Sequence, residues 1–133
     1  MYARIDNVDL LCSDVKVIHD FYHGVLGLPL HFPFEPEEGW VALDAGNLTI
    51  FIFETTNTDR GERRTPENEV NRPGWDSLAF EVEDLDAEIA RLDGKVEWAA
   101  EIIEWHHPSG AWYRYRPMYD PEGNMFYVTE PHR

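Results

Sequence analysis

Imidazole side chains are the groups in this chain best suited to acid–base or metal chemistry near neutral pH. His19 and His23 are four residues apart in a segment with helical spacing of apolar residues, so both could reach one metal ion. The pair lacks the glutamate of the helical HExxH zinc motif, and a bare pair of histidines is a weak signal. We therefore expect an ordinary solvated helix surface here.

A second pair, His106 and His107, directly precedes the turn residues Pro108-Ser109-Gly110. Adjacent residues on a loop can both face one site, and loops often carry function. No acidic residue is fixed beside them by the sequence pattern. Two alternatives remain: a plain loop, or a contact with a ligand in which one histidine acts as a general base.

Two arginines alternate with aromatic residues in the segment from Trp112 to Met118. In a strand Arg114 and Arg116 would share one face, where they could hold a carboxylate-bearing or planar ligand by bidentate hydrogen bonds and stacking. The alternative is a row of ion pairs with glutamates of a neighbouring strand. The candidates for that row are Glu97, Glu101 and Glu104.

Composition narrows the functional classes. The chain has 133 residues, 43% of them hydrophobic and 14% aromatic, which predicts one folded domain. The net charge of -15 opposes binding to nucleic acid or to an anionic membrane. A single cysteine, Cys12, excludes an internal disulfide and a multi-cysteine zinc site. With no apolar run near the length of a membrane span and no signal-peptide pattern, we expect a cytoplasmic protein.

The elements that must position these side chains follow an order that occurs twice. Strand, helix and three further strands are predicted first, and the same order follows about 70 residues later, which indicates an internal duplication. The first set is a strand at 5–11, a helix at 14–26 ended by Gly27, and strands at 30–34, 39–43 and 48–54. The second set is a strand at 75–82, a helix from Asp84 to Gly94, and strands at 95–103, 112–118 and 124–129. The polar stretch 55–74 between them is either a mobile linker or an arm that covers a ligand.

Four stretches together resemble the vicinal oxygen chelate superfamily, which includes glyoxalase I, bleomycin resistance proteins and extradiol dioxygenases. They are Ser13 to Leu28 with its Phe-Tyr and Leu-Gly-Leu pattern, Gly46-Asn47-Leu48, Leu78 to Ala87, and the tail turn Asp120 to Asn124. The resemblance implies an α+β fold of paired βαβββ modules whose strands curl around a concave cleft. Module one would span about 4–54, the loop 55–74 and module two 75–130, within a single domain over 1–133.

The resemblance also indicates where metal-binding members of the family place their four ligands. The matching positions here are Asn7, Phe51, Ser77 and Tyr127. Phe51 cannot coordinate a metal, and the other three side chains are poor ligands for zinc, nickel or iron, which favour imidazole and carboxylate. We expect no metal and no other cofactor.

The sequence favours a metal-independent binding protein of the glyoxalase and bleomycin resistance type, acting on a small aromatic or amphipathic molecule. Binding would rest on stacking and apolar burial with a few polar groups for orientation. The candidate ligand-binding residues are Asn7, Phe51, Phe53, Ser77, Arg114 and Tyr127. The resemblance implies a homodimer. The alternatives are a glyoxalase-like lyase, isomerase or dioxygenase with an atypical metal site, and a vestigial domain that acts only through protein contacts.

Overall fold

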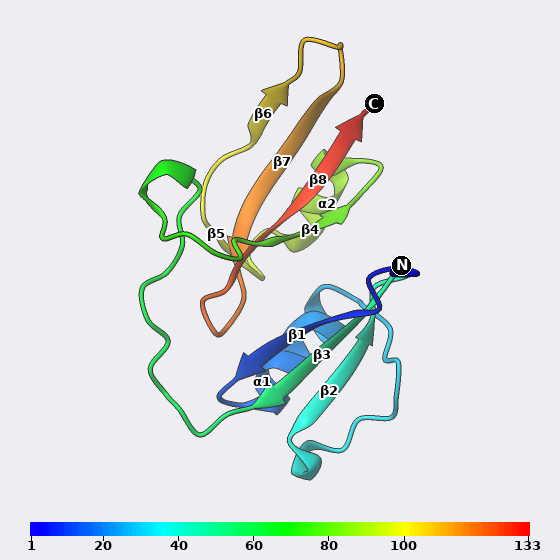
Figure 1. The fold of residues 1–133 in the computed structure, drawn as a ribbon, viewed down its shortest axis with the longest axis vertical. Coiled ribbons are helices and arrows are strands. Elements are labelled where there is room, and N and C mark those ends of the chain that lie inside the picture. Colours follow the sequence, from blue (N-terminus) through cyan, green and yellow to red (C-terminus); the bar gives the residue numbers. More distant parts are fainter. The chain divides into compact units, whose positions relative to one another are not determined.

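A computed structural model describes all residues from 1 to 133. The chain forms two compact units, unit 1 from Met1 to Asp59 and unit 2 from Arg60 to Arg133. In both units a helix lies against one face of a β-sheet (Figure 1). The predicted α+β class, with strand, helix and strands occurring twice, is confirmed. None of the helices has the length and apolar character needed to cross a membrane.

Unit 1 contains a three-stranded sheet in the order β1-β3-β2. Its elements are β1 (Asn7–Cys12), α1 (Val15–His19), the π-helix η1 (Asp20–Val25), the 3-10 helix η2 (Pro36–Glu38), β2 (Trp40–Asp44) and β3 (Thr49–Glu54). Strand β1 runs parallel to β3, and β2 runs antiparallel to it. The predicted helix at 14–26 is therefore confirmed as a helical segment whose second half is π-helical.

Acidic side chains fix the start of this helix. Asp14 caps it by accepting hydrogen bonds from the backbone N–H groups of Lys16 and Val17 at 3.0 and 3.3 Å. Glu54 at the end of β3 accepts a third, from Val15 at 3.1 Å. Gly27, with φ of 84°, ends the helical segment in the left-handed conformation that the sequence predicts.

The core of unit 1 lies between the helix and one face of the sheet. Side chains alternate across the strands, so every second residue faces the helix. Ile50 and Ile52 of β3 and Val41 and Leu43 of β2 are at most 1% exposed. Helix residues Val15, Ile18 and Tyr22 cover them and are equally buried.

The prediction of a strand at 30–34 is wrong. Only a single bridge forms there, between Leu30 and Leu43, with hydrogen bonds from the His31 N–H to Ala42 and from Asp44 to Pro29. Pro29 and Pro33 flank this bridge, and proline has no N–H to continue a ladder. The apolar residues at 30–34 suggest a strand, but Pro29 and Pro33 lack the N–H groups that would extend the ladder.

Unit 2 contains a larger sheet in the order β4-β8-β7-β5, with β6 also paired to β7. Its elements are the 3-10 helix η3 (Asn68–Val70), β4 (Leu78–Glu81), α2 (Leu85–Leu92), β5 (Glu97–Trp98), β6 (Ile103–His106), β7 (Trp112–Tyr119) and β8 (Met125–His132). Strands β4 and β8 are parallel, and the other pairs are antiparallel. Phe126, Val128, Met118, Leu85 and Leu92 form its core, each at most 2% exposed.

The predicted strand 95–103 is two strands with a gap between them. β5 and β6 both pair with β7, and Pro117 of β7 lies opposite the gap. Pro117 accepts a hydrogen bond from the Ala99 N–H at 2.9 Å but has no N–H to return, so the ladder stops there. The Arg116 guanidinium satisfies the Ala100 carbonyl at 2.8 Å. Pro117 thus explains the break between β5 and β6.

Residues 60–64 contact the sheet of unit 2 and the turn before β8. Arg63 makes two hydrogen bonds to the Glu97 carboxylate, and its guanidinium lies 4.3 Å from the centre of the Tyr119 ring. The Tyr119 hydroxyl donates to the Arg64 carbonyl at 2.7 Å, and Arg60 pairs with Glu122 at 2.8 Å. Part of the predicted linker thus contacts unit 2, while its mobility and its covering of a ligand stay predictions.

The turn before β8 forms as the sequence predicts. Asp120 is 3% exposed, and one of its carboxylate oxygens accepts hydrogen bonds from the N–H groups of Glu122 and Asn124, both at 2.9 Å. The Asn124 amide donates to the other oxygen, and Gly123 takes a φ of 86°. This turn fixes where β8 begins and therefore which face Tyr127 occupies.

Candidate ligand-binding faces

The face of each sheet opposite its helix carries most of the candidate site residues, and we call it the open face. In unit 1 the parallel register pairs Asn7 with Thr49, Asp9 with Phe51 and Leu11 with Phe53. All six side chains therefore share the open face, as the alternation of the sequence predicts. The rings of Phe51 and Phe53 stack with centres 6.0 Å apart and planes 12° apart.

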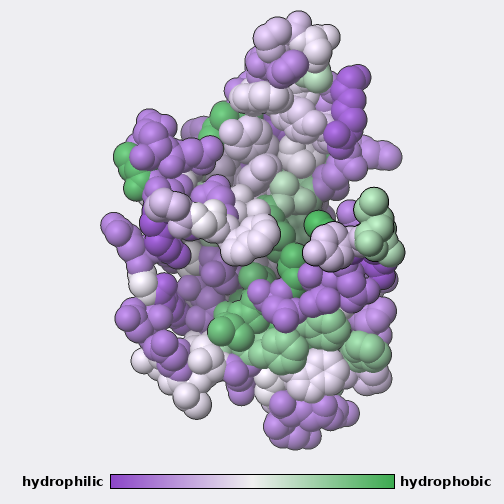
Figure 2. All heavy atoms as spheres, in the orientation of Figure 1, coloured by the Kyte–Doolittle hydropathy of each residue, from purple (hydrophilic) through white to green (hydrophobic).

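This open face has an apolar strip that water reaches. Leu11 is 61% exposed and Phe53 38%, whereas Phe51 is half-buried. Figure 2 shows green, hydrophobic side chains gathered among the purple, hydrophilic ones that dominate the visible surface. At the start of β1 the Asn7 amide donates to the Asp9 carboxylate at 2.7 Å, so the two polar groups satisfy each other. The remaining surface can stack with a flat molecule.

The open face of unit 2 is also aromatic. Tyr127 of β8 lies between Ala79 of β4 and Pro117 of β7, and its ring centre is 4.9 Å from that of Tyr115. Further along the sheet the rings of Trp105 and Tyr113 are 5.7 Å apart. Tyr127 is half-buried, so the part of its ring that stays exposed can contact a ligand. Ser77 directly precedes β4 and is half-buried.

The Tyr127 hydroxyl stays protonated under ordinary conditions. Burial raises the pKa of Tyr127 above its usual value, and the nearby Tyr115, Asp76 and Tyr113 raise it further. A protonated phenol can donate and accept a hydrogen bond but is a poor metal ligand. Tyr127 is therefore suited to orienting a neutral or charged small molecule.

A metal ion does not fit the four positions implied by the family resemblance. Phe51 offers only hydrocarbon, Tyr127 keeps its proton, and the Asn7 amide is already bonded to Asp9. Within the units no three His, Cys, Asp or Glu side chains are grouped so that they could hold a metal ion. The donor set of these positions thus disagrees with the metal chemistry of the metal-binding relatives.

Arg114 does not share a face with Tyr127. It projects from the helix side of the sheet, where it pairs with Asp86 of α2 at 3.1 Å and with Glu130 of β8 at 3.7 Å. The hydrogen bond to Asp86 raises the pKa of Arg114. Arg116, on the same side, pairs with Glu101 and lies over the Trp98 ring. Both arginines form ion pairs, as the second alternative from the sequence predicts. Arg116 pairs with one of the three glutamates named there, whereas Arg114 pairs with Asp86 and Glu130.

The histidines are held by neighbouring side chains. His106 lies on β6, stacked on Trp112 with ring centres 5.4 Å apart, and contacts Glu104 at 3.2 Å. The His107 Nδ1 contacts the Ser109 hydroxyl at 2.8 Å. Strand alternation sends these two imidazoles to opposite sides, so they do not form the joint site that a loop would allow.

His19 at the end of α1 and His23 in η1 also have partners. His19 stacks on Phe34 with ring centres 3.9 Å apart and contacts Asp20 at 2.8 Å. The His23 Nδ1 bonds the Leu28 carbonyl at 2.8 Å. The two rings lie 5.1 Å apart, and the His19 side chain is only 15% exposed, so the expectation of an ordinary solvated helix surface is wrong for His19.

Two residues of the unit 2 open face were absent from the candidate set. Tyr115 lies on the face of β7 opposite Arg114, and its pairing with Thr129 brings it beside Tyr127. Thr129 is 9% exposed, and its hydroxyl has no hydrogen-bond partner. A buried unpaired hydroxyl costs roughly 1–3 kcal/mol, so it calls for an explanation. No local sequence signal distinguishes such a threonine from a paired one.

Comparison with known proteins places the chain in one superfamily. The family model for the Glyoxalase/Bleomycin resistance protein/Dioxygenase superfamily matches residues 4–128. A glyoxalase family protein from Enterococcus faecalis is similar in structure, with a TM-score of 0.70 and 22% identity over 97% of this chain and 98% of that one. No curated protein matches the sequence significantly.

Two further solved structures share the fold. A genomically encoded fosfomycin resistance protein from Listeria monocytogenes has a TM-score of 0.69 at 16% identity, covering 97% of this chain and 93% of that one. A lactoylglutathione lyase from Agrobacterium tumefaciens has a TM-score of 0.64 at 19% identity, covering 97% and 94%. At these identities the likeness shows the fold and leaves the ligand open.

Proposed function

Because the chain belongs to the glyoxalase, bleomycin resistance protein and dioxygenase superfamily, we propose that it binds a small aromatic or amphipathic molecule on its open faces without a metal ion. The observation that carries the proposal is the aromatic lining of those faces. Phe51 and Phe53 in unit 1, and Tyr115 and Tyr127 in unit 2, form close ring pairs away from the buried cores. Apolar rings with a few polar groups are typical of small-molecule sites.

Polar groups beside the rings would set the orientation of the ligand. The protonated Tyr127 hydroxyl can donate or accept a hydrogen bond, and Asn7 and Ser77 carry further polar groups at the ends of their strands. Arg114 is left out of the proposed site, because its guanidinium is paired on the helix side of the sheet. Selectivity for a flat ligand would come from stacking on the rings of Phe51, Phe53 and Tyr127.

A metal-dependent lyase, isomerase or dioxygenase is the weaker candidate. Such an enzyme needs imidazole or carboxylate ligands, and the side chains at Asn7, Phe51, Ser77 and Tyr127 do not supply them. The names of the structural neighbours include a lyase and a resistance protein, so neither chemistry follows from the fold alone.

We also propose that the chain acts as a homodimer. The proposal is supported by the exposed apolar residues Leu11 and Phe53 on the open face of unit 1, which a second copy could cover. Light scattering during size-exclusion chromatography should then give twice the chain mass of 15.5 kDa. A single-chain mass at micromolar concentration would contradict the dimer without affecting the binding proposal.

Ligand screening with matched variants tests the binding proposal. Thermal shift with aromatic cations, aromatic carboxylates and glutathione adducts would find hits, and titration would give their affinities. Tyr127→Ala and Phe51→Ala should each weaken a true ligand about tenfold, since a stacking contact is worth roughly 0.5–1.5 kcal/mol beyond area burial. Phe34→Ala removes a ring that stacks on His19 of α1, on the helix side of the sheet, and is the control. A hit that binds both site variants as tightly as the wild type would refute the proposal.

A further inference from the structure

Strand β6 lies at the outer edge of the unit 2 sheet, where it pairs with β7 on one side and with no strand on the other (Figure 1). The His107 N–H bonds the Ala111 carbonyl at 2.8 Å in the turn that follows, so the backbone groups of the odd-numbered residues point toward β7. The N–H and C=O groups of Glu104 and His106 therefore point outward. Such an edge can pair with a further strand.

The side chains along this edge are exposed and differ in kind. Glu104 and His106 project on the helix side of the sheet, where they contact each other at 3.2 Å. Trp105 between them projects on the open face and is 50% exposed. Charged side chains protect an edge when they repel a second strand, but a carboxylate and an imidazole attract each other. The β6 edge thus lacks this protection against its own copy.

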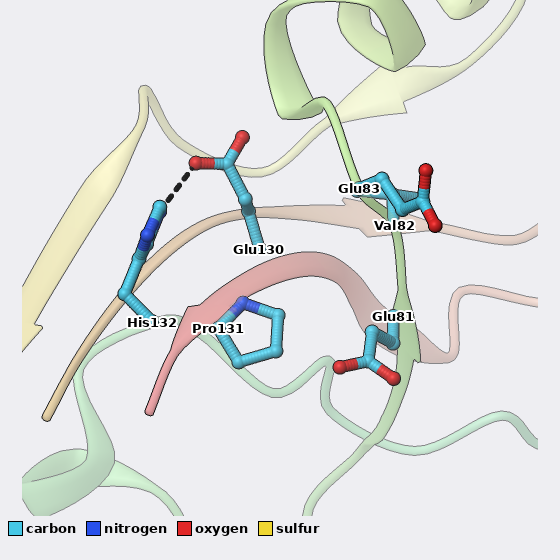
Figure 3. A pocket seen from close by; sticks show the side chains of 6 residues that line it. All are labelled: Glu81, Val82, Glu83, Glu130, Pro131 and His132. Atoms are coloured by element: carbon cyan, nitrogen blue, oxygen red, sulfur yellow. Dashed lines mark hydrogen bonds and ion pairs between the residues drawn. The ribbon is translucent and has the colours of Figure 1, made fainter.

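The other edge of the sheet is different. β4 ends at Glu81 while β8 continues to His132, and Pro131 has no N–H for a further bond to β4. A pocket of about 540 Å³ lies there, lined by Glu81, Val82, Glu83, Glu130, Pro131 and His132 (Figure 3). Its glutamates give this edge mainly negative side chains, which disfavour pairing with a second copy of the same edge.

The β6 edge is complementary to itself in one register. In an antiparallel pair of β6 strands with a two-fold axis at Trp105, Glu104 of each copy lies opposite His106 of the other. Both residues point their backbone groups outward, so each pair can exchange both of its backbone hydrogen bonds. A carboxylate then lies opposite an imidazole, which can donate a hydrogen bond to it. The two neighbouring registers place Glu104 opposite Glu104 or His106 opposite His106, and like residues there repel or gain nothing.

Proline limits the length of this contact. Pro108 is the next residue after His106 whose backbone would face outward, and it has no N–H to donate. At the other end β6 begins at Ile103. A ladder confined to this short strand forms a small interface, so we expect association that depends on protein concentration rather than a permanent dimer.

Pairing of the two edges would also extend the open face. Residues opposite each other at a non-hydrogen-bonded pair approach to about 4.5 Å between Cα atoms, so the two Trp105 side chains would be in contact. Trp105 already lies 5.7 Å from the Tyr113 ring. The second copy would therefore add its own tryptophan to the aromatic open face of unit 2.

We propose that two copies of this chain associate through β6, with Glu104 of each copy opposite His106 of the other and Trp105 paired at the two-fold axis. The inference rests on the homodimer part of the proposed function and assigns its contact to unit 2. It is independent of ligand binding at Phe51 and Tyr127.

Two variants with complementary charges test the register. His106→Glu brings carboxylates opposite each other, and Glu104→Lys brings a cation opposite the imidazole. Each variant alone should have a dissociation constant about tenfold higher than the wild type, because both cross-strand pairs lose their attraction. An equal mixture of the two restores opposite charges in both pairs and should associate about as tightly as the wild type. Sedimentation velocity at low salt measures all three, since exposed charges are least screened there.

His31→Glu is the matched control, because it makes the same change at an exposed histidine of unit 1. Its dissociation constant should equal that of the wild type. A control that dissociates as readily as His106→Glu would overturn the β6 contact, because net charge alone would then explain both effects.

Hydrogen exchange followed by NMR tests the backbone contact on the wild type, without a variant. The amide hydrogens of Glu104 and His106 should exchange slowly in concentrated protein and rapidly in dilute protein. Those of Ile103 and Trp105 point toward β7 and should change little with concentration. Exchange at Glu104 and His106 that does not depend on concentration would overturn the proposal.

The remaining outcomes separate this inference from the proposed function. A dimer that persists in both charge variants and is lost in Phe53→Ser overturns the β6 contact and leaves the homodimer standing on unit 1. A mixture that stays dissociated overturns the register. A single-chain mass for the wild type at every concentration overturns the contact and the homodimer together, whereas the binding proposal stands or falls with Tyr127→Ala and Phe51→Ala.

Discussion

The two units anchor their helices in the same way and differ on their open faces. Asp14 caps α1 and Asp84 caps α2, each through its side-chain oxygen. A glutamate at or near the end of the last strand then accepts the first helical N–H, Glu54 from Val15 and Glu130 from Leu85. Both arrangements satisfy donors that a helix start leaves unpaired. On the helix side, both units thus use an aspartate cap and a strand glutamate to hold the start of the helix.

On the open faces the side chains at matching positions have diverged. Asn7 and Phe51 in unit 1 correspond by order to Ser77 and Tyr127 in unit 2. None of these residues supports a core, so their types can differ without loss of the fold. The comparison teaches that stability is determined on the helix side, whereas the open faces are where binding specificity can arise.

The largest expected effect is the loss of a core ring. Phe126 is 2% exposed and meets Phe80 edge-on with ring centres 5.8 Å apart. Phe126→Ala should lower the free energy of unfolding by roughly 3–5 kcal/mol, measured by chemical denaturation. Ile50→Ala, the matching change in unit 1, should cost roughly 2–5 kcal/mol. Unchanged stability in either variant would show that the assigned register is wrong.

Most of the fold could be predicted from local patterns. Asp14, Asp84 and Gly27 mark helix ends by their side-chain and backbone chemistry, and alternation identifies the core face of β3 and β8. The errors lie where proline removes a backbone donor, at 30–34 beside Pro29 and in β7 at Pro117. The sequence shows these prolines, but only the pairing partner shows which bond each one interrupts.

The candidate site could be predicted only in part. Alternation places Phe51 and Phe53 on one face and Tyr127 on the corresponding face of unit 2. Alternation alone does not show that Arg114 lies on the helix side, because the face that Arg114 occupies depends on how β7 pairs with β8. Long-range register, which brings Tyr115 beside Tyr127, is not encoded in any short stretch.

The glutamate anchors should differ in strength. Glu130 is 13% exposed and has His132 and Arg114 beside it, so Glu130→Gln should cost about 1–2 kcal/mol of unfolding free energy. Glu54 is more exposed and lacks such neighbours, so Glu54→Gln should cost less. Equal losses in urea denaturation at neutral pH would refute this ranking.

Acid should weaken the Glu130 anchor. The Leu85 N–H, and then His132, lower the pKa of Glu130 below its usual value. A carboxyl with a lowered folded pKa stabilises the protein fully above its unfolded pKa, roughly 4.3, and loses this effect as the pH falls through the folded pKa. The difference between wild type and Glu130→Gln should therefore shrink on acidification. A difference that grows at low pH would contradict the assignment.

A smaller effect is expected in the arm of residues 60–74. Arg63→Ala removes the bidentate pair with Glu97 and the contact with the Tyr119 ring. Hydrogen exchange should accelerate at 60–66, whereas the core of unit 2 should exchange at its usual rate, because exposed ion pairs add little to global stability. Arg91→Ala is the control, since it removes an exposed ion pair with Glu88 on α2, outside the arm. Unchanged exchange in Arg63→Ala would show that other contacts hold the arm.

The central claim is that the chain has the family fold but lacks the side chains that bind metal in other members. Measuring its metal content tests this claim most directly. The full chain, purified without chelator and incubated with zinc, nickel, iron or manganese salts before dialysis, should hold far less than one metal per chain by elemental analysis. About one metal per chain, lost on Asn7→Ala, Ser77→Ala or Tyr127→Phe, would contradict the account.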